Sequence, residues 1–457
     1  MSKSKTAAIV LAAGLGTRMK SEKPKVMHPI AGRPMVQNLL ATLGKLNLDK
    51  IVVVVGPEMD DLEAAVAPHT TAVQYNRCGT GDAVKVGMEA LGNFNGNVLV
   101  LYGDTPLMTE QTLNAMLEAR QPIEGQFAPA VVVLGFLPEE PGAYGRLVTD
   151  EEDGELLEIV EANDATQEQL MIPLCNSGVM CFDGGVMPQL LARLSDDNAK
   201  GEYYLTDCVG LAREDGFSCS VVEGDEEELL GVNSRIELAL AETIAQDRLR
   251  EKAMKGGATL IDPSTTFFSY DTKIGKDVLI EPNVFFGPGV TIGNGVHIKA
   301  NCHFEGASID DGSVVGPFAR LRPGAKLAEN THVGNFVEIK NSDVEAGGKV
   351  NHLTYIGDAR VGAGANIGAG TITCNYDGFN KSRTEIGAGA FIGSNSALVA
   401  PVKIGAGAIV GAGSTLTADV GENDIVTTRA EQKRVPGAAE RFREAKRAQK
   451  EQNKKKG

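Results

Sequence analysis

The sequence predicts an α/β protein in two parts. The first is an N-terminal Rossmann-like domain with a mostly parallel sheet, and the second is a C-terminal left-handed parallel β-helix of hexapeptide repeats. Two patterns predict this fold. Apolar strand segments alternate with amphipathic helical segments in the N-terminal part. From about residue 267 to 420, an aliphatic or aromatic residue recurs at every sixth position, a period that fits neither an α-helix nor an ordinary strand.

The N-terminal domain is predicted from strands and helices that follow one another in turn. Strands are expected at Thr6–Leu11, Ile51–Val55, Val98–Tyr102 and Ala130–Phe136. Helices are expected at Met35–Leu46, Gly81–Leu91 and Gln111–Ala119. This alternation predicts an open sheet that binds its ligand at the carboxyl ends of the strands.

A glycine-rich loop, Ala12–Met19, follows the first strand and is the expected place for a phosphate group. It is neither common phosphate loop, because Met19 replaces the third glycine of the dinucleotide fingerprint and no Gly-Lys-Ser/Thr follows. The string L-A-A-G-x-G-T-R-M, continued by Lys20–Lys25, instead resembles the signature of sugar-1-phosphate nucleotidyltransferases. Arg18, Lys25 and a divalent metal would stabilise the charge that gathers when a sugar phosphate attacks a nucleoside triphosphate. A plain strand–turn–helix with surface basic residues is the alternative.

Later segments of this domain agree with that resemblance. Gln74 and Gly79–Gly81 offer a side-chain amide and a close backbone to a pyrimidine edge. Asp104 ends a strand and suits Mg²⁺, although a lone Asp there also suits a helix cap. The resemblance implies that Asp104 and Asn233 share the Mg²⁺. It implies that Gly145, Glu161 and Asn176 hold the amino sugar. The full set of residues that it implies for binding UTP and UDP-N-acetylglucosamine is Leu11, Ala12, Ala13, Gly14, Lys25, Gln74, Gly79, Thr80, Tyr102, Gly103, Asp104, Gly145, Glu161, Asn176 and Asn233.

A helix rich in strong helix formers is expected at Ser234–Lys255, with Ser234 as N-cap and Gly256-Gly257 as its stop. We expect it to act as a semi-rigid spacer. The chain then divides into a nucleotidyltransferase domain at 1–231, a linker helix at 232–255, and a β-helix domain with a basic tail at 256–457.

Three unbroken runs of hexads predict the β-helix. They begin at Ile274, Ile309 and Ile386, and each contains six apolar residues at six-residue spacing. Three hexads should close one coil, so that residues three hexads apart lie one above another at about 4.7–4.9 Å. The chain has 54 glycines, and the excess of glycine is concentrated in this region, where turns need residues without a Cβ penalty.

Three departures from the repeat indicate a ligand site on the β-helix. Arg322 and Lys340 are three hexads apart, and two stacked cations repel by about 1 kcal/mol even in water unless an anion such as a sugar phosphate lies between them. Two solvated side chains that fan apart are the alternative. The repeat is expected to break at 341–355, where His352 would act as a general base on an attacking amine. An insertion at Cys374–Lys381 would form a wall for a long cofactor.

At these residues the resemblance becomes specific. The strings F-A-R-L-R-P-G, H-V-G-N-F-V-E-I-K, N-H-L-T-Y-I-G-D, N-I-G-A-G-T-I-T-C-N-Y-D-G and F-I-G-S-N resemble the acetyltransferase domain of the bacterial bifunctional N-acetylglucosamine-1-phosphate uridyltransferase/glucosamine-1-phosphate acetyltransferase family. The resemblance covers nearly the whole chain. It implies that His352 is the general base and that Glu338 orients it. It implies glucosamine 1-phosphate contacts from Arg322, Lys340, Tyr355 and Asn366. It implies acetyl-CoA contacts from Ala369, Asn375, Tyr376, Ser394, Ala412 and Arg429.

The family resemblance also implies the reactions and the assembly. The β-helix would acetylate glucosamine 1-phosphate, and the N-terminal domain would join the product to UTP, giving UDP-N-acetylglucosamine for cell-envelope precursors. A homotrimer through the β-helix is implied, with acyl sites between neighbouring chains. Two alternatives are a nucleotidyltransferase whose β-helix serves assembly only, and a non-enzymatic interaction protein.

Composition limits the partners and the compartment. The net charge of −16 argues against a nucleic-acid binder. Seven dispersed cysteines without a CxxC pair are typical of a reducing compartment. The start of the chain lacks the long apolar core of a signal peptide, and no apolar run reaches transmembrane length. We therefore expect a cytoplasmic enzyme without membrane insertion.

Overall fold

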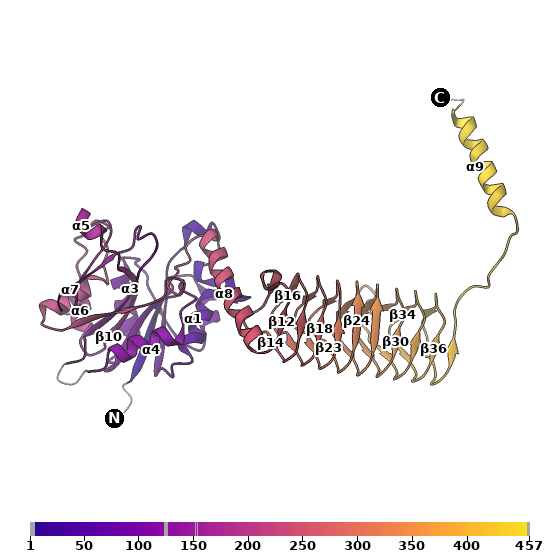
Figure 1. The fold of residues 1–457 in the computed structure, drawn as a ribbon, viewed down its shortest axis with the longest axis horizontal. Helices are drawn as coiled ribbons and strands as arrows, with labels where there is room; N and C mark the ends of the chain where they lie inside the picture. Colours follow the sequence, from indigo (N-terminus) through magenta and orange to yellow (C-terminus); the bar gives the residue numbers. More distant parts are fainter. Residues whose placement is uncertain (1–4, 123–126, 151, 153, 455–457) are drawn as a thin grey trace. The chain divides into compact units, whose positions relative to one another are not determined.

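The computed structural model describes residues 5–122, 127–150, 152 and 154–454 (Figure 1). The chain divides into two compact units. The first contains residues 1–253 and 267–270, and the second contains residues 254–266 and 271–457. Within the described ranges, no helix has the length and apolar character needed to cross a membrane.

The first unit is built on a nine-stranded sheet whose main order is β11-β7-β10-β6-β1-β4-β5. Strands β6, β1, β4 and β5 are parallel, as are β11 and β7, whereas β10 runs antiparallel to both of its neighbours. The prediction of a mostly parallel sheet is confirmed. The strands of this unit are β1 (Thr6–Leu11), β2 (Pro29–Ile30), β3 (Arg33–Pro34), β4 (Lys50–Val55), β5 (Thr70–Val73), β6 (Asn97–Tyr102), β7 (Val131–Phe136), β8 (Arg146–Thr149), β9 (Leu156–Val160), β10 (Cys175–Asp183) and β11 (Cys219–Glu223).

Helices cover both faces of this sheet. Successive residues of β1 point to opposite faces, so Ile9 joins the apolar cluster that contains Val84 of α3, and Val10 joins the cluster that contains Leu39 of α1. Helix α1 ends earlier than predicted, at Leu43 rather than Leu46, because Gly44 follows its last turn. The helices are α1 (Met35–Leu43), α2 (Asp60–Val66), α3 (Thr80–Leu91), α4 (Glu110–Ala119), α5 (Gln167–Leu170), α6 (Met187–Ala192), α7 (Asp207–Glu214) and α8 (Arg235–Lys255), with short 3₁₀ turns η1 (Thr17–Met19), η2 (Lys25–Met27) and η3 (Pro263–Thr265).

Helix α8 is packed rather than free. The backbone amide of Glu237 donates to the Ser234 hydroxyl at 3.4 Å, so the predicted N-cap is confirmed. Ala241 and Ile244 join an apolar cluster with Met35 of α1. The helix therefore belongs to the first unit up to residue 253, and its role as a semi-rigid spacer stays a prediction.

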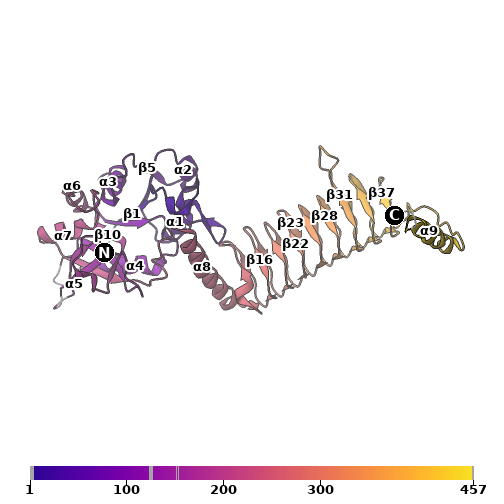
Figure 2. The ribbon, with the colours of Figure 1, turned by 90° about the horizontal axis from the view of Figure 1, so that it is seen from above.

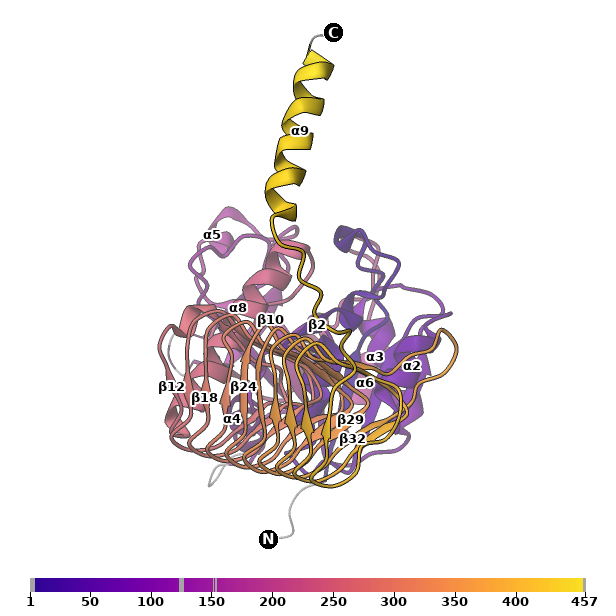
Figure 3. The same cartoon turned by 90° about the vertical axis from the view of Figure 1, so that its right-hand side faces the viewer.

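The second unit is a parallel β-helix of three sheets (Figures 1 and 3). The first sheet contains β12 (Thr259–Leu260), β15 (Leu279–Ile280), β18 (His297–Ile298), β21 (Val314–Val315), β24 (His332–Asn335), β27 (Lys349–His352), β30 (Asn366–Ile367), β33 (Phe391–Ile392), β36 (Ile409–Val410) and β38 (Ile425–Val426). The second contains β13 (Thr266–Phe267), β16 (Val284–Phe286), β19 (His303–Phe304), β22 (Arg320–Leu321), β25 (Glu338–Lys340), β28 (Tyr355–Gly357), β31 (Ile372–Cys374), β34 (Ala397–Val399) and β37 (Thr415–Leu416). The third contains β14 (Lys273–Ile274), β17 (Thr291–Ile292), β20 (Ser308–Ile309), β23 (Ala325–Leu327), β26 (Ser342–Val344), β29 (Ala359–Val361), β32 (Thr384–Ile386) and β35 (Val402–Ile404).

The predicted stacking is confirmed by the register. Ile274 pairs with Ile292, Ile280 with Ile298, and Leu321 with Ile339, in each case three hexads further along the chain. The side chain of Ile298 is fully buried. The hexad residues therefore form the continuous core of the coils.

The predicted break at 341–355 is wrong. Val333 pairs with Val350, and Ile339 pairs with Ile356, so that the spacing falls one position short of three hexads. The coil continues with one residue fewer, and Asn341 turns the shortened corner at a positive φ of 44°. The sequence period slips there while the stacking in space is kept. His352 accordingly ends a regular strand, β27.

The predicted insertion is confirmed. Val361 pairs with Ile386, a spacing well beyond three hexads, so this coil carries extra chain. The added residues form a short hairpin in which Tyr376 bridges Lys381, and Figure 2 shows this loop projecting beside β31. A loop of this kind supplies side chains that the regular coils do not have.

A matched pair of valines tests the inward packing of the coils. Val315 is fully buried, whereas Val314 beside it is partly exposed. Val315→Ala is expected to lower the free energy of unfolding of the β-helix by about 2–3 kcal/mol, because it removes two buried methyl groups and leaves a cavity. Val314→Ala should change it by less than about 1 kcal/mol. Denaturant unfolding followed by circular dichroism measures both, and equal effects would contradict the inward assignment.

Candidate active sites

A cavity of about 250 Å³ lies in the first unit at the carboxyl ends of β1 and β6. Ten residues predicted from the sequence line it: Leu11, Ala12, Ala13, Gly14, Lys25, Gln74, Gly79, Thr80, Tyr102 and Asp104. These residues come from four separate segments, which meet because β1 lies between β6 and β4 in the sheet. The lining also includes Val26, Arg77, Ala83 and Glu202, which the sequence analysis missed.

The Lys25 ammonium group lies between the two predicted metal ligands. Its Nζ donates to the Asp104 carboxylate and, at 2.9 Å, to Oδ1 of Asn233. Two oxygens that converge on one cation are a donor set that fits Mg²⁺, which prefers oxygen ligands and takes others from water and phosphates. The alternative role of Asp104 as a helix cap is wrong, since Thr109 caps α4.

Local backbone structure brings these groups together. Gly16 has a φ of 63°, and a Cβ there would lie 2.5 Å from Cβ of Lys25, so a larger residue would displace the lysine. On the other side, the Glu237 carboxylate accepts from the backbone amides of Asn233, at 2.7 Å, and Ser234, at 2.6 Å. The first turn of α8 thereby fixes the position of Asn233.

Gln74 and Gly79 form the side of the cavity that is expected to read the base. The Gln74 side chain is buried, and its Nε2 donates to Asp82 at 2.7 Å and to the Gly79 carbonyl at 3.3 Å. Those bonds leave Oε1 of Gln74 as the acceptor for a ligand N–H group. Gly79 has a φ of 108° and lies against the backbone of Tyr203, where a Cβ would meet it at 2.7 Å.

The three residues predicted to hold the amino sugar lie at the ends of β8, β9 and β10. The backbone N–H of Asn176 donates to the backbone carbonyl of Gly145 at 2.8 Å. A Cβ at Gly145 would lie 3.4 Å from the Val160 carbonyl oxygen. Glu161 follows Val160 directly and accepts from the Thr206 hydroxyl at 3.4 Å. The structure therefore brings Gly145, Glu161 and Asn176 together.

This group adjoins the nucleotide cavity through Tyr102. A Cβ on Gly178, in the same strand as Asn176, would lie 2.7 Å from the Tyr102 ring. Burial, followed by the nearby carboxylates of Asp104 and Glu161, raises the pKa of Tyr102 above its usual value. The phenol therefore stays neutral beside the carboxylates of Asp104 and Glu161. Arg18 is exposed in η1 and does not line the cavity, so its role stays a prediction.

The second site lies on the β-helix and begins with a group of cations. The amide of Arg322 donates to the Ile339 carbonyl at 2.8 Å, so Arg322 and Lys340 lie on neighbouring coils as predicted. Lys381 of the insertion joins them. Contact with Lys381, followed by burial and Arg322, lowers the pKa of Lys340, while the Asp358 carboxylate opposes this shift. The sequence analysis gave Lys381 no ligand role, although its position in the insertion could have indicated one.

Tyr355 extends this cation group along the next coil. Gly357 is in register with Lys340, and a Cβ at Gly357 would lie 2.4 Å from the Tyr355 hydroxyl. The hydroxyl group therefore lies over Gly357, in line with Lys340. Asn366, the fourth predicted sugar-phosphate residue, lies on β30 in register with Lys349.

His352 is held by a residue other than the one expected. Its Nδ1 lies 2.6 Å from Oδ1 of Asn335, its register partner on the preceding coil. An amide oxygen only accepts, so Nδ1 carries the proton and Nε2 carries the lone pair. Glu338, the expected orienting group, instead accepts from Arg322 at 2.8 Å. In this structure Asn335 therefore takes the orienting contact.

Three of the predicted acetyl-CoA residues continue the column that contains His352. The amides of Gly370, Asn395 and Gly413 donate to the carbonyls of His352, Ala369 and Ser394, respectively, on the preceding coils. Ala369, Ser394 and Ala412 thus follow His352 from coil to coil. We call this line the acyl column; its members are His352, Ala369, Ser394 and Ala412.

The remaining acetyl-CoA candidates lie in two places. Arg429 lies beside Gly413, with its Cδ 3.7 Å from the Cβ position there, next to Ala412. Asn375 donates to Asp358, and Tyr376 is 60% exposed in the insertion. Arg429 thus lies at the acyl column of its own chain. Asn375 instead contacts Asp358, the carboxylate beside the cation group.

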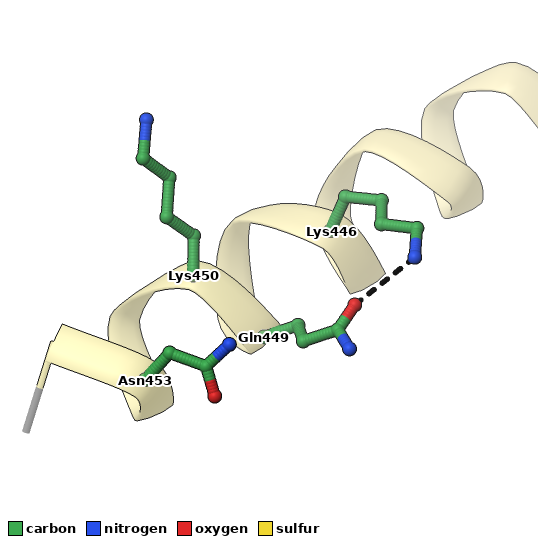
Figure 4. A pocket seen from close by; sticks show the side chains of 4 residues that line it. All are labelled: Lys446, Gln449, Lys450 and Asn453. Atoms are coloured by element: carbon green, nitrogen blue, oxygen red, sulfur yellow. Dashed lines mark hydrogen bonds between the residues drawn. The ribbon is translucent and has the colours of Figure 1, made fainter. Parts of the chain in front are cut away.

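A further hollow lies along helix α9 (Ala438–Lys454). Figure 4 shows the side chains that line it, with Lys446 Nζ donating to Gln449 Oε1 at 3.0 Å. Its lining residues, Lys446, Gln449, Lys450 and Asn453, all come from one exposed helix. A hollow with one wall encloses no ligand, and we assign it no site.

Comparison with known proteins identifies the class to which both units belong. Residues 8–164 match the family described as the MobA-like NTP transferase domain. Residues 271–306 and 383–418 match the bacterial transferase hexapeptide family. The fold and the two sites therefore define a two-part transferase, with a nucleotidyltransferase unit followed by a hexapeptide-repeat unit.

Close relatives define the particular family. The chain is 61% identical to the bifunctional protein GlmU of Paramagnetospirillum magneticum over 97% of this chain and 98% of the relative. It is 61% identical to that of Rhodospirillum rubrum over 96% and 97%, and 54% identical to that of Sphingopyxis alaskensis over 98% and 99%. The chain belongs to the GlmU family of bifunctional enzymes.

The donor set at Lys25 generates a prediction about metal binding. Asp104→Asn is expected to weaken divalent-metal binding in the nucleotide cavity by about tenfold or more, because it removes the charged one of two oxygen ligands. Mn²⁺ binding in the presence of UTP, followed by electron paramagnetic resonance, measures the effect. Asp61→Asn, on an exposed turn of α2, is the control. Unchanged Mn²⁺ affinity in Asp104→Asn would exclude this carboxylate as a ligand.

Proposed function

We propose that the two units catalyse consecutive steps in the synthesis of UDP-N-acetylglucosamine. The β-helix unit transfers an acetyl group from acetyl-CoA to the amine of glucosamine 1-phosphate. The N-terminal unit then transfers UMP from UTP to N-acetylglucosamine 1-phosphate and releases pyrophosphate. One observation carries the bifunctional proposal. The positioned imidazole of His352 lies just before strand β28. Gly357, at the other end of β28, is in register with Lys340 of the cation group, which also contains Arg322 and Lys381. A β-helix that served assembly alone would need neither.

The acetyl transfer follows from this arrangement. The cation group, with the Tyr355 hydroxyl, binds the sugar phosphate. The Nε2 lone pair of His352 takes a proton from the amine as the amine nitrogen bonds to the thioester carbonyl carbon. The carbon–sulfur bond then breaks, and the CoA sulfur leaves with a proton. The acyl column provides a line of small residues along which an extended CoA arm lies.

The uridylyl transfer is supported by the nucleotide cavity. Gln74 and Gly79 read the uracil edge, and the backbone of Ala12–Gly14 binds the nucleotide. A phosphate oxygen of the sugar phosphate bonds to the α-phosphorus of UTP while the bond to pyrophosphate breaks. Asp104 and Asn233 would hold Mg²⁺, which neutralises charge on the phosphates when bound. Lys25, whose Nζ contacts Asp104 and Asn233, would supply a positive charge to the phosphates.

Assembly and location follow the family. We propose a homotrimer through the β-helix, because its exposed apolar side chains, such as Phe318 at 47% and Phe336 at 55% exposure, favour contact with a second copy. Acetyl-CoA and UTP are substrates of the cytoplasm, where we expect the enzyme to act. The product is a precursor of the cell envelope.

A coupled assay tests the proposal as a whole. Purified protein receives glucosamine 1-phosphate, acetyl-CoA, UTP and Mg²⁺, and free CoA and pyrophosphate are followed separately. Release of both is expected, with pyrophosphate requiring prior acetylation. Pyrophosphate from N-acetylglucosamine 1-phosphate without any release of CoA would reduce the β-helix to a scaffold.

A pair of histidines tests the base. His352→Ala is expected to lower the rate of acetyl transfer by about 10²–10⁴-fold, the usual contribution of a general base, and to leave uridylyl transfer unchanged. His332→Ala is the matched control, because His332 is exposed on the preceding coil, in the same strand as Asn335. The two rates are measured in separate assays. Acetyl transfer that persists in His352→Ala would show that another group removes the proton.

A further inference from the structure

Arg77 is a cation of the nucleotide cavity to which the proposed reaction assigns no role. It stands between Gln74 and Gly79, in the segment that reads the base, and it lines the same cavity as Ala13 and Gly14. Its Nε donates to the carbonyl oxygen of Ala13 at 2.9 Å. One side chain therefore connects the base-reading segment to the phosphate loop.

The absence of a side chain at Gly56 leaves the space that the Arg77 guanidinium occupies. This glycine follows β4, the neighbour of β1 in the sheet. A Cβ on Gly56 would lie 2.5 Å from Nη2 of Arg77 and 3.3 Å from the Ala13 carbonyl oxygen. The guanidinium therefore lies against the backbone at a point where any side chain would push it away from the loop.

The bond to Ala13 sets the direction of the next amide. The peptide unit between Ala13 and Gly14 is planar and trans, so its carbonyl and its N–H point in opposite directions. When Arg77 holds the carbonyl on one side, the N–H of Gly14 points to the other. A Cβ on Gly14 would meet no atom within 4 Å, so this part of the loop is open to a ligand.

The charges of the cavity make this arginine distinctive. Lys25 is the other basic residue of the lining, and it is bonded to Asp104 and Asn233. The Nε bond uses one of the five N–H donors of Arg77, and it is the one hydrogen bond that Arg77 makes among the described residues. The cavity also holds the Glu202 carboxylate. Among the described residues, Arg77 is therefore the basic residue of the lining that no carboxylate pairs with, and an incoming triphosphate would meet its positive charge.

We infer that Arg77 is a positioning residue for the nucleoside triphosphate: it ties the base-reading segment to the phosphate loop and aims the Gly14 amide at the phosphates. The inference rests on the proposed uridylyl transfer in this cavity. Because the effect is on the nucleotide alone, it separates the two substrates of the reaction. UTP binding depends on Arg77, whereas binding of N-acetylglucosamine 1-phosphate does not.

The test is a double-mutant cycle between Arg77 and Gly56 on the full chain. Arg77→Ala is expected to raise the KM and the Kd for UTP by about tenfold or more, and to change the KM for N-acetylglucosamine 1-phosphate by less than about threefold. Gly56→Ala should produce the same pattern, because the added methyl group displaces the guanidinium. If Gly56 acts through Arg77, then Gly56→Ala should have little further effect in the Arg77→Ala background.

Two controls accompany the cycle. Arg193→Ala removes an arginine that is paired with Glu214 and Asp215 outside this cavity, and it should leave the KM for UTP unchanged. Acetyl transfer by every variant, which uses the other unit, should be unchanged, and circular dichroism with thermal unfolding reports whether the first unit of each variant is folded. A KM for UTP within twofold of the wild-type value in Arg77→Ala would overturn the inference. Additive effects of Gly56→Ala and Arg77→Ala would also overturn it, as would equal increases in both KM values. Failure of the proposed function is separate, since the wild-type chain would then form no pyrophosphate.

Discussion

The in-register stacking of buried apolar residues is the constraint on which the candidate site of the β-helix depends. Each strand of a coil places an inward residue, such as Ile339 or Ile356, in register with its equivalent on the neighbouring coil. Because side chains alternate across a strand, this register also fixes which outward residues stand in line. Asn335 and His352 meet as register partners. The core of the β-helix thus determines the geometry of a site on its surface.

The regular coils alone do not complete that site. Arg322 and Lys340 lie on the coils, whereas the third cation, Lys381, comes from the insertion. Asp358 balances this positive group and receives a hydrogen bond from Asn375 of the same insertion. Burial raises the pKa of Asp358, but hydrogen bonds from Asn341 and Asn375 and the nearby lysines outweigh it and lower the pKa overall. A rigid repeat with one irregular loop therefore combines a positioned imidazole, His352, with a charge cluster suited to a phosphate.

The nucleotide cavity depends on a different arrangement, in which segments far apart in the chain meet at one sheet edge. Lys25, Asp104 and Asn233 come from a loop after β1, the end of β6, and the residue pair before α8. Gly16 permits the approach of Lys25, and Glu237 fixes Asn233. The helix that we expected to be a spacer contributes to this arrangement, because its Glu237 carboxylate accepts from the Asn233 backbone amide and its middle packs into the apolar cluster with Met35.

The sequence alone determined the fold class and most of the ligand candidates, because both depend on local pattern. Hexad spacing predicted the coils, the strand–helix alternation predicted the sheet, and the loop Ala12–Met19 pointed to nucleotide chemistry. Tertiary structure decided the pairings. Asn335 rather than Glu338 contacts His352, and Arg77 reaches the phosphate loop, because these contacts join residues 17 and 64 positions apart. The coil that loses one residue at Asn341 makes the same point, since the stacking of neighbours, and not the period of the sequence, keeps His352 in register.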